Sequence, residues 1–263
     1  MKIAVSGKGG SGKTTVSALL ARTLAGEGRT VFAVDADPTA NLGSMLGLPR
    51  DQWPVPISQM KDLIKERTGT NGNYGTYFKI NPDVRDLPDR FSRTVNGVRL
   101  LTLGGVAHGG AGCICPESAL LKSLITHLLL RPGEFVVIDM EAGIEHLGRA
   151  TAQAVTIMLI VVNPGQQSIQ TAQTIRRLAR DIQITRLGVV LNKVTPETDV
   201  EKLIADLDGL PVLGRLSYDP RIVQADIEGA SPFTGDERQS KEIHAILNSI
   251  AGQTGESRSQ RNP

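Results

Sequence analysis

Aromatic side chains make up only 3% of this 263-residue chain, and cysteine occurs only twice. So few aromatic rings argue against binding of single-stranded nucleic acid by base stacking. The formal net charge is +2 and much of the excess lies in the last residues, so no basic face for DNA is expected. No apolar run approaches the roughly 18 residues of a membrane span, and the N-terminus does not have the pattern of a signal peptide. We therefore expect a cytoplasmic protein with reduced thiols, no nucleic-acid partner and no stable membrane association.

Short aliphatic runs alternate with helical patterns along the chain. The runs are apolar at successive positions, as in strands that are covered on both faces. Strands are predicted at residues 2–6, 30–34, 99–103, 135–139, 156–162, 187–191 and 211–213, and helices at 13–27, 116–130, 168–181, 199–206 and 237–250. This alternation predicts an α/β fold with a doubly wound, mostly parallel sheet flanked by helices. Ligands are then expected at the carboxyl ends of the strands.

The length favours a single domain, which we place at residues 1–251. Residues 52–97 interrupt the alternation and are predicted to be an insertion, with helical spacing in its first part and loop in its second. Residues 252–263 are polar and are predicted to be a disordered tail.

The stretch GKGGSGKTT follows the first predicted strand and opens a helix, which is the context that a phosphate-binding loop (P-loop) requires. Its glycines allow successive backbone N–H groups to face the phosphates of a nucleotide. Lys13 is expected to reach the β- and γ-phosphates, Thr14 to bind Mg²⁺ and Thr15 to support the α-phosphate. The predicted nucleotide-binding residues of the loop are Gly7, Lys8, Gly9, Gly10, Ser11, Gly12, Lys13, Thr14 and Thr15.

A second lysine, Lys8, directly follows the first glycine of this loop. The form GKGGxGKT resembles the deviant Walker A ATPases, which include MinD, nitrogenase reductase, arsenite-pump and metallocentre-assembly ATPases. The resemblance implies an ATPase in which Lys8 crosses a dimer interface to the nucleotide of the partner. An ATP-dependent homodimer is therefore expected.

Two further stretches match motifs of the same ATPases. VDADPTANL resembles switch I, which makes Asp37 the residue that orients the attacking water and leaves Asp35 as a magnesium-shell or structural carboxylate. FVVIDMEAGIE resembles Walker B and switch II. The resemblance implies that Asp139 holds Mg²⁺ through water and that the N–H of Gly143 reaches the γ-phosphate. Lys8, Lys13 and Asp37 are the catalytic candidates.

The base is expected to be adenine. A guanine site usually carries an NKxD element, whereas VLNKVT has Thr195 where the Asp should be. In the similar ATPases an Asn at this point contacts adenine, so Asn192 is the candidate. The later stretch LSYDPRI resembles the loop that closes over the base.

Both cysteines, Cys113 and Cys115, lie in GGAGCICPE, after the predicted strand 99–103. They are interpretable as buried small residues, as a strained disulfide or as metal ligands. Side chains at i and i+2 of an extended segment project to the same side, so the two thiolates are able to bind one ion together. Tetrahedral sites need four donors, and a two-fold dimer would supply two such pairs.

The P-loop, DADPTANL, GCICPESALL, DMEAGIEHLGRAT and FKINPDVRDLPDRFS together resemble the CooC family of nickel-insertion ATPases for carbon monoxide dehydrogenase, over residues 1 to about 250. The resemblance implies that Cys113 and Cys115 bind Ni²⁺ (or Zn²⁺) across the dimer. It further implies that ATP binding or hydrolysis controls metal delivery to a client metalloenzyme. Two alternatives stay open at this point. One is an iron–sulfur ATPase like nitrogenase reductase, and the other is a MinD-like switch that binds lipid through an apolar stripe at Ile243, Ile246, Leu247 and Ile250.

Overall fold

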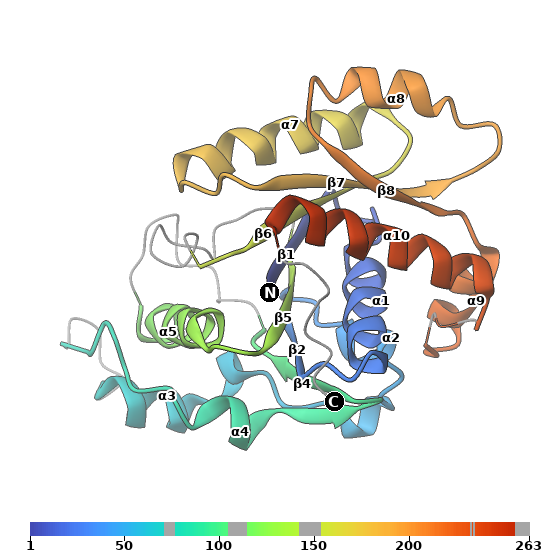
Figure 1. The fold of residues 1–263 in the computed structure, drawn as a ribbon. Helices are drawn as coiled ribbons and strands as arrows, with labels where there is room; N and C mark the ends of the chain where they lie inside the picture. Colours follow the sequence, from blue (N-terminus) through green and yellow to red (C-terminus); the bar gives the residue numbers. More distant parts are fainter. Residues whose placement is uncertain (71–76, 105–114, 142–153, 232, 234, 256–263) are drawn as a thin grey trace.

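A computed structural model describes residues 1–70, 77–104, 115–141, 154–231, 233 and 235–255. Its centre is an eight-stranded sheet of order β3-β4-β2-β5-β1-β6-β7-β8 (Figure 1). All neighbouring strands are parallel except β3 and β4, which are antiparallel. The strands are β1 Lys2–Gly7, β2 Val31–Ala36, β3 Arg93–Val95, β4 Val98–Thr102, β5 Phe135–Met140, β6 Ile157–Val162, β7 Leu187–Val194 and β8 Val212–Ser217. The predicted doubly wound α/β fold is confirmed.

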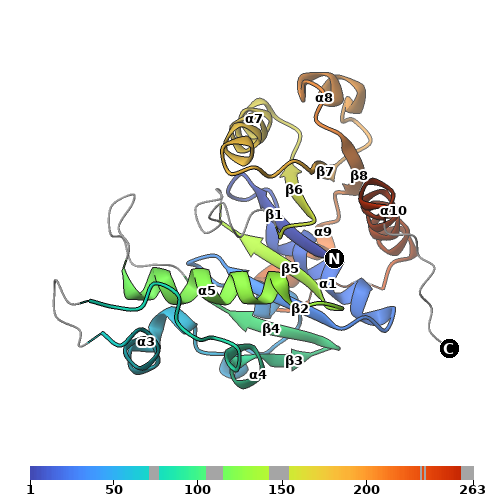
Figure 2. The ribbon, with the colours of Figure 1, turned by 60° about the vertical axis from the view of Figure 1, so that its left-hand side comes forward.

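Helices cover both faces of this sheet, and each face has its own apolar core. On one face α1 and α10 pack against the strands, and on the other α5 and α7 do so (Figures 1 and 2). Long aliphatic side chains dominate both cores, as the scarcity of aromatic residues requires. The helices are α1 Lys13–Gly26, α2 Leu42–Met45, α3 Lys61–Thr68, α4 Leu87–Phe91, α5 Pro116–Leu130, α7 Gln166–Asp181, α8 Val200–Asp206, α9 Pro220–Ile227 and α10 Glu237–Thr254, with 3₁₀ turns at Arg50–Gln52 and Ile57–Gln59.

The insertion is the part of the fold that the sequence described least well. The helical spacing of its first part is confirmed by α3. Its second part, residues 70–91, was expected to be loop, and this is wrong at its end, which forms α4; the strand β3 that follows was not predicted. Strand β3 forms a hairpin with β4 through Asn96 and Gly97, which both have positive φ values, of 48° and 78°. Asn-Gly is a strong hairpin signal, but a strand of three residues is too short to show an alternating pattern.

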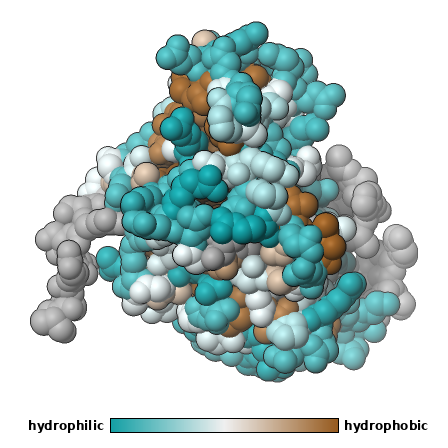
Figure 3. Space-filling view, turned by 90° about the vertical axis from the view of Figure 1, so that its right-hand side faces the viewer, coloured by the Kyte–Doolittle hydropathy of each residue, from teal (hydrophilic) through white to brown (hydrophobic). Residues whose placement is uncertain are grey.

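The C-terminal helix α10 settles the position of the apolar stripe. Ile243, Ile246, Leu247 and Ile250 are all buried in the core that α10 shares with α1 and β8. The stripe is therefore occupied by packing and is not presented to a lipid surface. The face seen in Figure 3 is mainly hydrophilic, with its apolar residues in small separate groups. Among the described residues, no helix is both long and apolar enough to cross a membrane.

Helix α10 also runs to Thr254, three residues beyond the domain boundary predicted at residue 251. The start of the predicted tail is thus helical, and residues 256–263 lie outside the described part of the chain.

Candidate functional site

The predicted P-loop joins β1, near the middle of the sheet, to the first turn of α1. Two glycines fit it tightly to its neighbours. A Cβ atom on Gly7 would lie 2.5 Å from the carbonyl oxygen of Val161 on β6, and one on Gly12 would lie 2.2 Å from Nδ2 of Asn192 on β7. Gly12 has a φ of 92° and is the N-cap of α1, where no side chain caps the helix. The first N–H groups of α1 are thus available to an anion, as phosphate binding requires.

Lys13 and Thr14 begin α1 and lie beside a buried carboxylate on β5. Lys13 is itself buried, and its charge acts on Asp139. The carboxylate of Asp139 accepts hydrogen bonds from the hydroxyls of Thr14 and Ser17, with a Ser17 Oγ to Oδ1 distance of 3.2 Å. The structure thus brings together the three residues that the sequence assigned to the γ-phosphate and Mg²⁺.

Asp139 also has a second carboxylate as its neighbour. Asp35 on β2 is its partner in the β2–β5 register, and each residue is only 1% exposed. Burial raises the pKa of Asp35 to about 6, and burial followed by repulsion from Asp35 raises the pKa of Asp139 to about 7. A buried carboxylate pair of this kind, next to a threonine hydroxyl, suits a hard divalent cation with oxygen ligands. The residues therefore fit Mg²⁺, with Thr14 and Asp139 as the groups that would hold it.

Asp35 itself uses its carboxylate on the backbone of the switch I segment. Its Oδ1 accepts a hydrogen bond from the N–H of Asp37 at 3.2 Å, and its Oδ2 accepts one from the N–H of Leu42 at 2.9 Å. These two bonds tie both ends of the segment to β2. Of the two roles left open for Asp35, the structural one matches these contacts.

Asp37 follows β2 at the same edge of the sheet and is half-exposed. Its Oδ1 accepts hydrogen bonds from the N–H of Thr39 at 2.9 Å and from the Thr39 hydroxyl at 2.7 Å. In this arrangement Thr39 fixes the direction of the Asp37 carboxylate. Gly143, which was expected to meet the γ-phosphate, lies outside the described residues.

The predicted base-binding stretches meet at a narrow cleft. Thr15, Asn192, Ser217 and Asp219 line it together, although they come from α1, β7, β8 and the segment after β8. Its free volume is about 10 Å³, which is near the least that holds one water molecule. A nucleobase would therefore enter only if the cleft widened.

Ion pairs hold this cleft closed on the α10 side. Arg221 binds Asp219, with a shortest distance of 2.7 Å, and it also pairs with Asp236, the N-cap of α10. Glu242 on α10 accepts hydrogen bonds from the N–H and the hydroxyl of Ser217. The segment LSYDPRI is thus joined to α10 by an ion pair and by hydrogen bonds.

Three side chains at the ends of β6 and β7 donate hydrogen bonds to carbonyl groups of the P-loop. Asn192 Nδ2 donates to the Ser11 carbonyl at 2.7 Å, Lys193 Nζ to the Gly10 carbonyl at 2.9 Å, and Asn163 Nδ2 to the same Gly10 carbonyl at 3.4 Å. Sequence reasoning gave Asn163 and Lys193 no role. Both residues lie at the carboxyl ends of predicted parallel strands, where ligand-binding residues are expected, and this position could have identified them.

Cys115 is the N-cap of α5. Its backbone is extended, with φ −108° and ψ 159°, and its Sγ accepts a hydrogen bond from the N–H of Ser118 at 3.4 Å. Cys113 lies outside the described residues, so the structure does not test the pair. Within the described ranges, no group of three or more His, Cys, Asp and Glu side chains lies close enough together to hold a metal ion.

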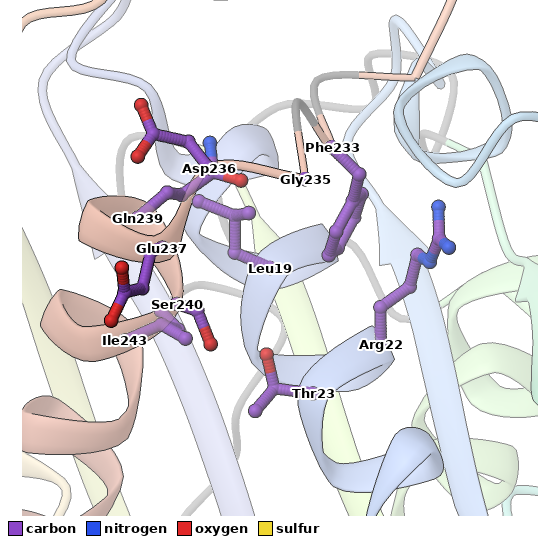
Figure 4. Close-up of a pocket in the computed structure, with 10 residues that line it drawn as sticks. All are labelled: Leu19, Arg22, Thr23, Phe233, Gly235, Asp236, Glu237, Gln239, Ser240 and Ile243. Carbon is purple, nitrogen blue, oxygen red and sulfur yellow. The ribbon is translucent and has the colours of Figure 1, made fainter.

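A separate groove of about 550 Å³ lies between α1, the helix that follows the P-loop, and the start of α10 (Figure 4). Leu19 and Ile243 line its apolar part, and Arg22 lies over the ring of Phe233 at 3.9 Å from the ring centre. None of the predicted site residues lines this groove, so it is distinct from the nucleotide site.

Comparison with known proteins agrees with this geometry. Residues 2–233 match the family described as the CobQ/CobB/MinD/ParA nucleotide binding domain. The chain is 43% identical to the carbon monoxide dehydrogenase accessory protein CooC of Rhodospirillum rubrum, over 97% of this chain and 98% of that protein. It is also 43% identical to an uncharacterised ATP-binding protein of Methanocaldococcus jannaschii, over 95% of this chain and 97% of that protein.

Among solved structures, the MinC:MinD cell division complex of Aquifex aeolicus contains a chain with the same fold. The TM-score is 0.68 at 21% identity, over 99% of this chain and 98% of that chain. A ParA family ATPase of Chlorobium tepidum gives a TM-score of 0.66 at 19% identity, over 95% and 97% of the two chains. These likenesses establish the fold. Together with the family match and the site geometry, they show that the chain belongs to the CobQ/CobB/MinD/ParA family of nucleotide-binding proteins and is an ATPase of that family.

Proposed function

We propose that this ATPase is a nickel-insertion factor for carbon monoxide dehydrogenase. It would form an ATP-dependent homodimer and carry a soft metal ion on Cys113 and Cys115 of both chains. The observation that carries the proposal is the 43% identity to a carbon monoxide dehydrogenase accessory protein over nearly the whole of both chains. Cys115 of the CICPE stretch is the N-cap of α5, which adds to this support.

The nucleotide chemistry follows from the residues at the ends of β1, β2 and β5. Backbone N–H groups at the start of α1 bind the phosphates, and Lys13 neutralises charge on the β- and γ-phosphates. Thr14 and Asp139 would hold Mg²⁺, which would supply positive charge against the negative charge that develops on the phosphates. Asp37 orients the attacking water after its carboxylate leaves Thr39. Lys8 reaches across the dimer to the nucleotide of the partner.

The metal cargo is assigned to the thiolates before α5. Thiolate is the form that binds metal, and the positive end of a helix dipole stabilises it. Cys115 receives an N–H of the first turn of α5 on its sulfur. The backbone of Cys115 is extended, and in an extended segment side chains two residues apart project to the same side. Two such pairs at a two-fold axis would give four sulfur ligands.

The test is metal stoichiometry in the presence of a non-hydrolysable ATP analogue. We expect one Ni²⁺ per two chains, measured by equilibrium dialysis, and no tight binding by Cys113→Ser or Cys115→Ser. Serine is a good N-cap, so the Cys115→Ser variant should keep α5 intact and serve as a folded negative control. One ion per chain would contradict a shared site. A brown absorption after anaerobic purification would instead indicate an iron–sulfur cluster.

The two lysines of the P-loop provide an independent test of dimerisation. Lys13→Ala should abolish nucleotide binding, because it removes the charge that faces the β- and γ-phosphates. Lys8→Ala should retain nucleotide binding by the monomer but fail to dimerise with the ATP analogue in analytical ultracentrifugation. Normal dimerisation of Lys8→Ala would refute its proposed reach into the partner.

A further inference from the structure

Strand β7 is irregular where it passes the P-loop. Leu191 pairs with Arg215 of β8, but the next paired residues are Val194 and Ser217, so β7 contains one extra residue. The irregularity includes Lys193, whose φ of 58° lies in the left-handed region. This is the pattern of a β-bulge, which commonly re-aims a side chain next to an active site.

The bulge changes which way two consecutive side chains point. In a regular strand, neighbouring residues project to opposite faces. Here Asn192 and Lys193 both reach the P-loop, and their nitrogen atoms bind the carbonyls of Ser11 and Gly10 at 2.7 and 2.9 Å. Two adjacent residues of β7 therefore bind two adjacent carbonyls of the loop.

These contacts matter because of what lies on the other side of the same peptide groups. The Ser11 carbonyl is buried and needs a hydrogen-bond donor, which Asn192 of β7 supplies, whereas the exposed Gly10 carbonyl accepts from Lys193 of β7 and from Asn163 after β6. With the Ser11 carbonyl held toward β7, the N–H of Gly12 in the same peptide group faces the opposite side, where an anion would lie, while the N–H of Ser11 donates to the Lys8 carbonyl at 3.0 Å. The Asn192 amide also fills the space that any side chain at position 12 would need.

We propose that Asn192 and Lys193 are positioning residues for the ATPase reaction, and that the β7 bulge exists to aim both of them at the P-loop carbonyls. They set the direction of the loop N–H groups before the nucleotide binds. The inference rests on the ATPase activity and is independent of nickel delivery. It gives Asn192 a role in holding the loop where the sequence suggested a contact with adenine.

The identity of residue 193 allows a sharp test. Glycine adopts a left-handed φ without a steric penalty, so Lys193→Gly is compatible with the bulge and removes the whole side chain, the ammonium group included. Lys193→Met removes the ammonium group and keeps the unfavourable φ. Lys202→Met, at an exposed position on α8, is the matched control for loss of a lysine charge.

The measurements are ADP affinity by titration calorimetry, kcat and KM for ATP, and thermal unfolding without nucleotide. We expect Lys193→Gly and Lys193→Met to weaken ADP binding about ten-fold, the size of one lost charge-assisted hydrogen bond, and to raise the KM for ATP alike. Lys193→Gly should unfold at or above the wild-type temperature. Wild-type ADP affinity in Lys193→Gly would overturn the proposal, because the lysine would then serve only the turn.

Asn192→Leu separates loop positioning from recognition of the base. The leucine side chain is close to the amide in size and adds no charge beside the phosphates, but it cannot donate to the Ser11 carbonyl. If Asn192 positions the loop, Asn192→Leu should weaken ADP and GDP binding by the same factor. A change in the ratio of ADP to GDP affinity, without a common loss, would show instead that Asn192 reads the base.

Discussion

The carboxylate of Asp139 should lower the stability of the nucleotide-free protein at neutral pH. It is 1% exposed, Asp35 lies beside it, and its pKa is raised from 3.8 to about 7. Substitution Asp139→Asn removes the charge but leaves an oxygen that accepts the hydrogen bonds of Thr14 and Ser17. We therefore expect the variant to be more stable than the wild type at pH 8 when no Mg²⁺ or nucleotide is present.

The sign and size follow from proton linkage. The folded protein takes up a proton on Asp139 below about pH 7, whereas the unfolded chain does so only below about pH 4. Stability is thus greatest in acid and falls as the pH rises toward 7, by about 1.4 kcal/mol per pH unit. Between pH 5 and pH 8 the wild type should lose about 3 kcal/mol relative to Asp139→Asn, and the loss should level off above pH 7.

Urea unfolding in EDTA at pH 5, 6, 7 and 8 would measure this difference. The comparison of the two proteins at each pH cancels the contribution of titrating groups that do not interact with Asp139; Asp35 does interact with it, so the difference reports the titration of the pair. A parallel pH dependence in the two proteins, or a less stable variant at pH 8, would refute the reasoning. The variant should also lose Mg²⁺-dependent ATP hydrolysis, because the carboxylate that lowers the stability of the free protein is the one proposed to hold Mg²⁺.

Three other substitutions test separate parts of the site. Cys115→Ala should lower the free energy of unfolding by about 1 kcal/mol through loss of the α5 N-cap, whereas Cys115→Ser should not, as thermal unfolding would show. Asp35→Asn should lower kcat about ten-fold, by the loss of one hydrogen bond to switch I, with the Mg²⁺ dependence of the rate unchanged; a weaker response to Mg²⁺ would make Asp35 a metal ligand. Gly12→Ala should abolish ADP binding in calorimetry, because its Cβ would displace the Asn192 amide; near-normal affinity would show that the loop adjusts.

The sequence predicted those parts of the fold that local pattern determines. All seven predicted strands are present, because each is an aliphatic run in a sheet that is covered on both faces. Short elements such as α2 and β3 were missed, since four or three residues carry no measurable period. The P-loop, Asp139 and Asp37 were predicted as site residues from motifs, which are contiguous in sequence.

Contacts between distant segments were not accessible in the same way. Whether Asp35 binds metal or backbone depends on where the N–H groups of Asp37 and Leu42 point. The sequence identified Asn192 but not its partner, because one extra residue in β7 decides which way Asn192 and Lys193 face. That extra residue is recognisable only against β8, the strand beside it.

The strand order indicates how the proposed nucleotide site and the proposed metal site would be connected. Along the carboxyl edge, β4 leads toward Cys115, β2 carries Asp35 and the Asp37 segment, and β5 carries Asp139. The P-loop follows at β1, and the base cleft lies beyond it at β7 and β8. On the proposed function, a nucleotide bound along this edge with its base at β7 and β8 would have its terminal phosphate toward β5 and β2. Loss of that phosphate would then act first on the segment that Asp35 holds, which follows the strand next to β4. The hydrogen bonds from Asn192 and Lys193 would meanwhile keep the Ser11 and Gly10 carbonyls in place.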